Sequence, residues 1–210
     1  AGRTDKGVHA WGQVAAYPGP PVLLASLNSL LPEDIAVLSC AEAAPGFDAR
    51  SDAEARTYCY RVLDRPEPSA FLRRTALHWP HACDRELLHA CAAAIPGRHD
   101  FTAFTLAESG HRWFNREIES AAWREDGDLL EFWITADAFL RHMNRTLVGT
   151  MLEVAQGRRE LAQFVALLDG AHRRDAGHTA KPHGLALASV RFADGRGRRR
   201  SRSGSPETET

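Results

Sequence analysis

The chain has 210 residues, of which 44% are hydrophobic and 25% are charged, and its formal net charge is −1 at pH 7. This composition is typical of a globular protein with a sizeable core, and no apolar run approaches the roughly 20 residues of a membrane-spanning helix. A net charge near zero argues against unselective binding of nucleic acid, so RNA would be bound by locally clustered arginines. Four cysteines without a C-x-x-C pair predict reduced thiols in a cytoplasmic protein.

The N-terminal quarter of the chain predicts a loop followed by short elements. Asp5 lies in the loop, with a cation (Arg3) two residues before it and a flexible glycine (Gly7) two residues after it. A carboxylate and a guanidinium on a tight loop at the mouth of a sheet suit nucleophilic or acid–base chemistry. Apolar alternation and the proline positions then predict a strand over residues 11–17, a helix over 22–31, β structure over 35–40 and an irregular link over 47–50.

The remainder of the chain predicts longer elements. Residues 55–63 alternate, which places Tyr58 and Tyr60 on one face of a strand. Asp84 is typical of a helix N-cap, and residues 125–127 are typical of a hairpin turn. We expect a strand over 55–63, a helix over 84–95, strands over 116–124 and 128–135, helices over 139–155 and 160–168, and a strand over 185–192. Strands and helices mixed with a hairpin predict an α+β fold rather than a doubly wound parallel sheet.

The first ten residues carry a resemblance to a known family. Their string, A-G-R-T-D-K-G-V-H-A, is similar to the G-R-T-D-A-G-V-H loop of the TruA family of tRNA pseudouridine synthases, in which the aspartate is the nucleophile. Further segments that resemble the family follow at 55–60, 141–149 and 179–185, so the resemblance spans nearly the whole chain. Lys6 stands where the family usually has a small residue; it could hold phosphate or point into water, and we expect solvent exposure.

This resemblance implies two ferredoxin-like halves that share one largely antiparallel sheet, with helices packed on it and the catalytic cleft between the halves. Residues 1–50 would be the remainder of the N-terminal half, which carries the Asp5 loop, and residues 51–194 the C-terminal half. Because the chain begins inside the loop and without Met, we expect an N-terminally incomplete member. The Arg/Ser-rich tail, residues 195–210, is predicted to be disordered, either as an RNA-contacting arm or as a dispensable extension.

The resemblance also implies the chemistry of an isomerase that converts uridine to pseudouridine. The N1–C1′ bond breaks and the uracil rejoins through C5, so no electrons are lost and no cofactor is expected. Asp5 would be the nucleophile, attacking either C1′ or the ring, and the guanidinium of Arg145 would pair with its carboxylate and keep it ionised. Tyr58 would pack on the target base and assist proton removal at C5.

Substrate binding is expected from the same resemblance. Arg3 would stack in the gap that an everted uridine leaves and bond phosphate, while Tyr58 would contact the base. Lys181 is a further candidate for a phosphate contact. The family implies tRNA as the partner, uridines at positions 38 to 40 of its anticodon arm as targets, and a homodimer; neither a metal nor a membrane is expected.

Three alternatives stand beside this interpretation. The first is a zinc site, because the chain has His78, His81, Cys83, His89 and Cys91, but their spacing is not that of a usual zinc motif. The second is a non-catalytic RNA-binding protein or RNA chaperone on the same fold. The third is a synthase that acts on another RNA, since substrate choice depends on a shape that no short motif encodes.

Overall fold

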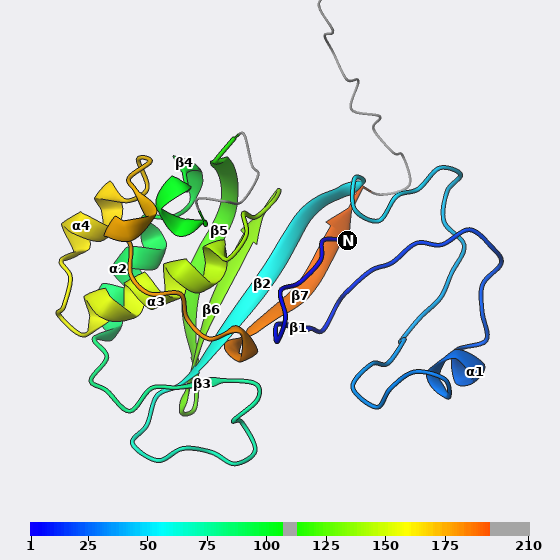
Figure 1. The fold of residues 1–210 in the computed structure, drawn as a ribbon, viewed down its shortest axis with the longest axis horizontal. Helices are drawn as coiled ribbons and strands as arrows, with labels where there is room; N and C mark the ends of the chain where they lie inside the picture. The colour runs from blue at the N-terminus through cyan, green and yellow to red at the C-terminus, as the bar shows by residue number, and fades with distance from the viewer. Residues whose placement is uncertain (107–112, 194–210) are drawn as a thin grey trace, which may run out of the picture.

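The computed structural model describes residues 1–106 and 113–193, which form an α+β fold around a seven-stranded sheet (Figure 1). The strand order is β1-β7-β2-β6-β5-β4, and the short β3 pairs with β2. The strands are β1 (His9–Ala10), β2 (Ala53–Leu63), β3 (Leu77–His78), β4 (Gly97–Asp100), β5 (Asn115–Asp126), β6 (Leu129–Ala136) and β7 (Leu185–Phe192). The pairs β1–β7 and β2–β3 are parallel and the others antiparallel. The predicted class, α+β with a largely antiparallel sheet, is therefore confirmed.

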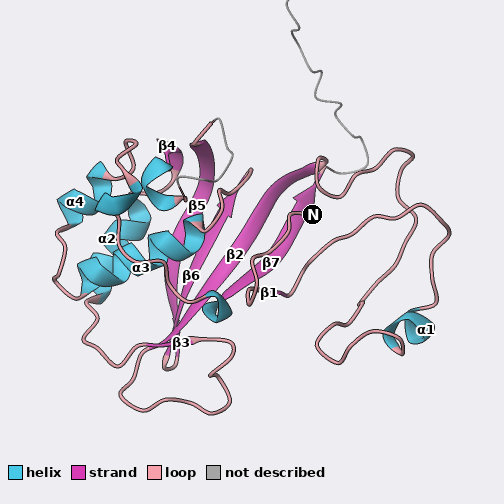
Figure 2. Ribbon diagram, in the orientation of Figure 1, coloured by secondary structure: helices cyan, strands magenta, loops and turns pink. Residues whose placement is uncertain are grey.

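In the part of the chain that the structure describes, three helices cluster beside β5 and β6, and α1 lies apart beyond β7 (Figure 2). The helices are α1 (Leu24–Asn28), α2 (Arg85–Ala93), α3 (Met143–Ala155) and α4 (Leu161–Ala166), with 3-10 turns at Thr102–Phe104, Arg173–Asp175 and Pro182–Gly184. The core centres on α3, where Leu147, Met151 and Val154 are completely buried. No helix within the described residues combines the length and the apolarity that crossing a membrane requires.

Most elements predicted after residue 53 are confirmed. In β2, Tyr60 and Val62 face the core and Tyr58 packs at its border, as the alternation predicted. Asp84 caps α2, because its side chain accepts a hydrogen bond from the Leu87 backbone N–H (3.1 Å). The β5–β6 hairpin and β7 also lie where the pattern placed them. These elements have strong local signals in both periodicity and turn residues.

The helix predicted over residues 139–155 begins later than expected, at Met143. His142 precedes it with a φ of 65°, in the left-handed region, so the backbone cannot continue the helix toward Phe139. Within the described residues, His142 is the one non-glycine residue with positive φ. Its conformation leaves residues 138–142 as a loop at the end of the sheet.

The strand predicted over residues 11–17 is wrong. β1 ends at Ala10, and the N–H groups of Trp11 and Gly12 both bond to the Leu187 carbonyl (2.8 and 3.2 Å). In a regular ladder with β7, only every second residue of this segment would donate its N–H to β7, each to a different carbonyl. Donation by two consecutive residues to one carbonyl therefore ends the regular pairing. The chain therefore leaves the sheet after β1.

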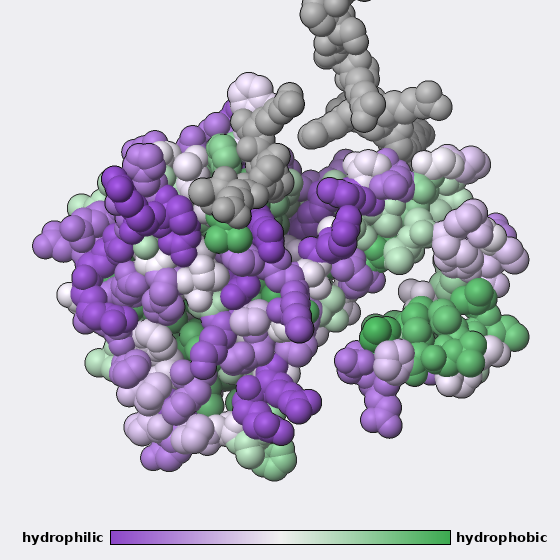
Figure 3. Space-filling view, viewed as in Figure 1, coloured by the Kyte–Doolittle hydropathy of each residue, from purple (hydrophilic) through white to green (hydrophobic). Residues whose placement is uncertain are grey.

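Residues 13–52 form a long excursion away from the sheet. The predicted helix over 22–31 shortens to α1, in which no residue is buried, and the β structure predicted over 35–40 does not form. The Asn28 side chain takes the place of a strand partner there, because it donates to the Val37 carbonyl (3.0 Å) and accepts from the Val37 N–H (2.8 Å). Exposed apolar side chains gather on this excursion (Figure 3), among them Leu23, Leu30, Ile35 and Leu38.

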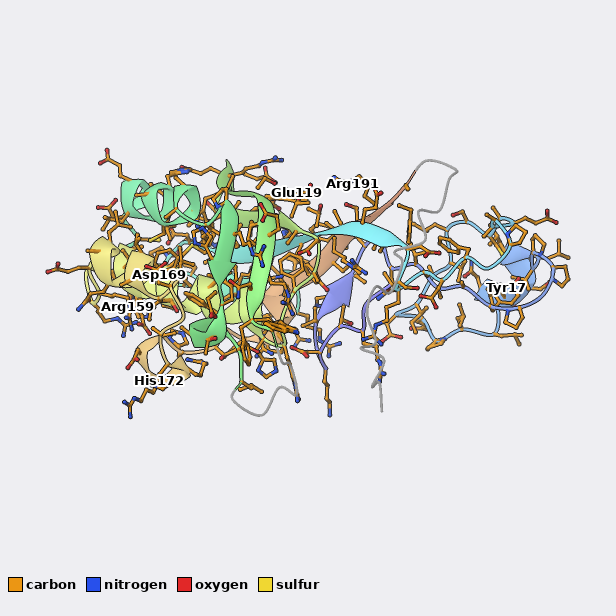
Figure 4. All side chains as sticks on the ribbon, turned by 90° about the horizontal axis from the view of Figure 1, so that it is seen from above. Tyr17, Glu119, Arg159, Asp169, His172 and Arg191 are labelled. Carbon is orange, nitrogen blue, oxygen red and sulfur yellow. The ribbon has the colours of Figure 1, made fainter. Side chains whose placement is uncertain are left out.

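The first and last described strands lie side by side at one edge of the sheet, where His9 pairs with Ala186. At the C-terminal end of β7, Arg191 forms an ion pair with Glu119 of β5 (2.6 Å; Figure 4). Residues 1–50 contribute β1 and α1, and the division of the chain at residue 50 stays a prediction. The predicted disordered tail, residues 195–210, lies outside the described residues.

Candidate active site

A cavity of about 380 Å³ lies where the N-terminal loop meets the end of the sheet and the start of α3. Residues 2–5 form one wall, residues 138–145 another, and β2 contributes Tyr58. Its lining contains six arginines, namely Arg3, Arg50, Arg56, Arg116, Arg141 and Arg145. Among the described residues, Asp5 is the one carboxylate that lines it. The cavity is therefore strongly cationic in a chain whose net charge is close to zero.

Asp5 faces the side chains of Arg145 and His142 at the α3 end of the cavity. Its Oδ2 lies 3.4 Å from Arg145 Nη1 and 3.3 Å from His142 Nε2. The loop is closed by a hydrogen bond from the Val8 N–H to the Asp5 carbonyl (3.0 Å) and turns at Gly7, whose φ is 83°. Within the described residues, Oδ1 takes part in no hydrogen bond or ion pair. One oxygen of the carboxylate is thus oriented and the other is available to a ligand.

Arg145 is held firmly on the first turn of α3. Its Nε donates to the Ala180 carbonyl (2.7 Å), and the Ala180 N–H donates back to the Arg145 carbonyl (3.1 Å). The segment that carries Ala180 can pass so close because residue 149 is glycine: a Cβ there would overlap the His178 carbonyl oxygen. The guanidinium is mostly buried and so is fixed toward Asp5 before any substrate binds.

The expected pairing of Asp5 with Arg145 is present across 140 residues of sequence. The hydrogen bond from the guanidinium orients the Asp5 carboxylate, and a nucleophile needs such a fixed orientation.

His142 belongs to the same cluster, and sequence reasoning assigned it no role. Its left-handed backbone turns the ring toward Asp5. Burial lowers the pKa of His142, and the charges of Arg145 and Arg141 lower it further, whereas Asp5 acts in the opposite direction. The imidazole is therefore mainly neutral at pH 7. The available signal was its place in the segment 141–149, three residues before Arg145.

Tyr58 lines the cavity from β2, as expected of a residue that meets the base. Its ring packs edge-on against Phe139, with the centroids 5.0 Å apart. Burial raises the pKa of Tyr58, so its hydroxyl is protonated at neutral pH. Tyr60, two residues on, is fully buried and donates a hydrogen bond to the Lys181 carbonyl (2.7 Å), which places it in the core rather than in the cavity.

The two expected phosphate contacts lie in different surroundings. Arg3 lines the cavity and is exposed. Lys181 is also exposed but does not line the cavity, and its contact with phosphate stays a prediction. Lys6 is exposed, as expected from its departure from the family loop.

The candidate zinc ligands are not gathered by the fold. Burial raises the pKa of Cys91 to about 12, and His78 Nε2 lies 3.0 Å from the Arg65 carbonyl oxygen. Within residues 1–106 and 113–193, no three histidine, cysteine or acidic side chains come together so that they could hold a metal ion.

Four arginines of the cavity were also missed, namely Arg50, Arg56, Arg116 and Arg141. Arg56 lies two residues before Tyr58 on β2, and this period of two was the signal that could have placed both on one face. Arg116 has no such signal, because it comes from β5 and reaches the cavity through the pairing of the strands.

Comparison with known proteins agrees with this geometry. A family model described as tRNA pseudouridine synthase matches residues 91–193. A protein of Myxococcus xanthus named tRNA pseudouridine synthase A is 42% identical over 93% of this chain and 76% of its own length. Proteins of the same name from a Geobacillus strain and from Moorella thermoacetica are 39% and 38% identical, each over 91% of this chain and over 79% and 80% of their own lengths. The chain therefore belongs to the family of tRNA pseudouridine synthase A.

Proposed function

We propose that this protein converts uridine to pseudouridine in tRNA, with Asp5 as the nucleophile. The observation that carries the proposal is the Asp5 carboxylate, which pairs through Oδ2 with Arg145 in a cavity that six arginines line. A cationic cavity suits a polyanionic substrate, and the relatives' shared name specifies tRNA.

The isomerisation breaks the N1–C1′ bond, joins C5 to C1′ and moves one proton from C5 to N1. Asp5 Oδ1 attacks either C1′ or the uracil ring, while Arg145 donates a hydrogen bond to Oδ2 and His142 lies beside it. Tyr58 packs on the base and assists removal of the C5 proton. Because its hydroxyl is protonated at the start, Tyr58 gives up that proton as it accepts the one from C5, and N1 of the uracil is the final proton acceptor. The reaction has no net oxidation, so the proposal includes no cofactor.

The substrate complex is proposed on the same basis. A uridine in the anticodon arm, at positions 38 to 40 in the family, would leave its stack at a cost of a few kcal/mol. Arg3 is exposed at the cavity and would fill the gap and bond phosphate. The proposal also includes that the protein binds tRNA as a homodimer and that it acts in the cytoplasm.

Release of tritium from tRNA labelled at uridine C5 tests the function. We expect the wild-type protein to release tritium, and Asp5→Asn to abolish the release while circular dichroism and melting stay close to wild type. Release by Asp5→Asn at the wild-type rate would remove Asp5 from the nucleophile role. Binding of tRNA without release by the wild-type protein would instead indicate a non-catalytic RNA-binding protein.

A further inference from the structure

The wall of the cavity formed by β2 and β5 carries two guanidiniums that the Asp5 site does not use. Arg56 of β2 is paired in register with Ala136 of β6, which in turn is paired with Ile118 of β5. Arg116 lies two residues before Ile118, and so its side chain leaves the same face of the sheet. Both arginines line the cavity.

Each guanidinium is bonded to backbone carbonyls and keeps unused donors. Arg116 Nη1 donates to the carbonyls of Trp113 (3.0 Å) and Asn115 (2.6 Å). Its Nε is buried and has no hydrogen-bond partner among the described residues. Arg56 Nη1 donates to the carbonyls of Ala53 and Asp137, and its Nη2 to that of Arg50. An arginine has five N–H donors, so these bonds leave three on Arg116 and two on Arg56.

The two positive charges are not neutralised locally. Within the described residues, neither Arg56 nor Arg116 forms an ion pair with a carboxylate. Burial lowers the pKa of both arginines, and the nearby charge of Asp137 offsets this only in part. A half-buried cation with unused donors gains most from an anion that brings several acceptor oxygens.

We propose that Arg56 and Arg116 form a phosphate subsite, which binds the RNA backbone beside the target nucleotide and is separate from the Asp5–Arg145 pair. The proposal rests on the proposed function, because the phosphate belongs to the tRNA strand that enters the cavity. Phosphate fits better than a carboxylate ligand, because it offers three or four oxygens rather than two. Two forked guanidiniums from strands about 10 Å apart can both bind the oxygens of one phosphate group, or each can bind one of two successive phosphate groups. The subsite fixes the strand, while Asp5 and Tyr58 act on the base.

The test compares tRNA binding at several KCl concentrations for wild type, Arg56→Gln and Arg116→Gln. Arg158→Gln is the matched control: it removes the same charge from an exposed position beyond the C-terminal end of α3, about 20 Å of helix from the cavity. We expect binding to weaken about 10-fold in each cavity variant, as for loss of a charge-assisted hydrogen bond. The slope of log K against log salt should fall by about 0.7 to 0.9 for each lost phosphate contact, and remain unchanged in the control.

A single-turnover measurement at saturating tRNA separates binding from chemistry. The subsite predicts a raised half-saturating tRNA concentration with a tritium-release rate close to wild type. Unchanged affinity and salt slope in Arg116→Gln would overturn the proposal, as would equal losses in Arg158→Gln. Arg56→Gln loses three hydrogen bonds to carbonyls and so could have a lower Tm than wild type. In that case Arg116→Gln alone decides, because the hydrogen bonds of Arg116 join it only to residues at most three positions away in the sequence.

Failure of the proposed function gives a different result. A wild-type protein that binds tRNA but releases no tritium would refute the synthase activity, while the salt slopes of the variants would still decide for or against the subsite. A wild-type protein that binds no tRNA would overturn both.

Discussion

Replacement of Gly149 by alanine tests how the active-site arginine is held. Gly149 lies one turn after Arg145 on α3, against the backbone of His178, and an added Cβ would overlap the His178 carbonyl oxygen and lie 3.1 Å from its carbon. A close contact between carbon and oxygen needs about 3.3 Å, so relief of the overlap with the oxygen requires the helix and the segment to separate by at least about 1 Å. Backbone atoms on both sides of the contact leave no flexible side chain to yield.

The size of the effect follows from this separation. Overpacking of this kind costs about 1 to 3 kcal/mol, which corresponds to a fall in Tm of roughly 2 to 12 °C for a domain of this size. The moving segment carries Ala180, whose carbonyl accepts from Arg145 Nε (2.7 Å). A displacement of about 1 Å at a catalytic group can cost about 100-fold in rate. We therefore expect Gly149→Ala to lose activity far beyond its loss of folded protein.

Thermal melting and single-turnover tritium release measure the two effects, with Gly157→Ala as the control. Gly157 has a φ of 71° and open space around its Cβ position, just past the end of α3. Alanine at this position adds only the cost of the left-handed backbone, about 1 to 2 kcal/mol. The variant should therefore be less stable than wild type, while its folded fraction releases tritium at the wild-type rate. Equal rates for the two variants, once corrected for unfolded protein, would refute the role of the Gly149 contact.

Two further predictions concern His142. His142→Gly and His142→Ala both remove the ring from Asp5, but only alanine keeps the cost of the left-handed backbone, about 1 to 2 kcal/mol. The glycine variant should therefore melt roughly 2 to 8 °C higher at an equal rate of tritium release, and equal melting would contradict this. Because burial lowers the pKa of His142, the unfolded state binds its proton more readily, and the free energy of unfolding falls as pH drops below about 6.5. Urea titrations at pH 5 and 7 measure this change. The free energy of unfolding should fall less between pH 7 and pH 5 in His142→Asn than in wild type, and an equal fall in both proteins would exclude His142 as its source.

The local sequence predicts the elements whose signals are complete within a few residues. β7 matches its predicted range, and α2 begins at its Asp84 cap, because periodicity and capping act over one or two turns. Residues 11–17 have the alternation of a strand but do not form one, since a strand also needs a partner in register. No local pattern contains that information.

The site was predictable only in part for the same reason. The pairing of Asp5 with Arg145 came from the resemblance to a family, and no spacing rule connects residues 140 positions apart. Arg116 reaches the cavity through the register of β5 with β6. The left-handed backbone of His142, which aims its ring at Asp5, has no signature in a segment that otherwise has helical periodicity.

The two members of the Asp5–Arg145 pair differ in how they are anchored. Arg145 stands on a buried helix, whereas the Asp5 loop joins the sheet through the two-residue strand β1 and the few bonds around it. Local opening costs less free energy where fewer hydrogen bonds break. Amide hydrogens of residues 8–12 should therefore exchange with deuterium well before those of α3. The Asp5 loop is therefore the part of the site that can adjust to an incoming nucleotide, while Arg145 keeps its position on α3.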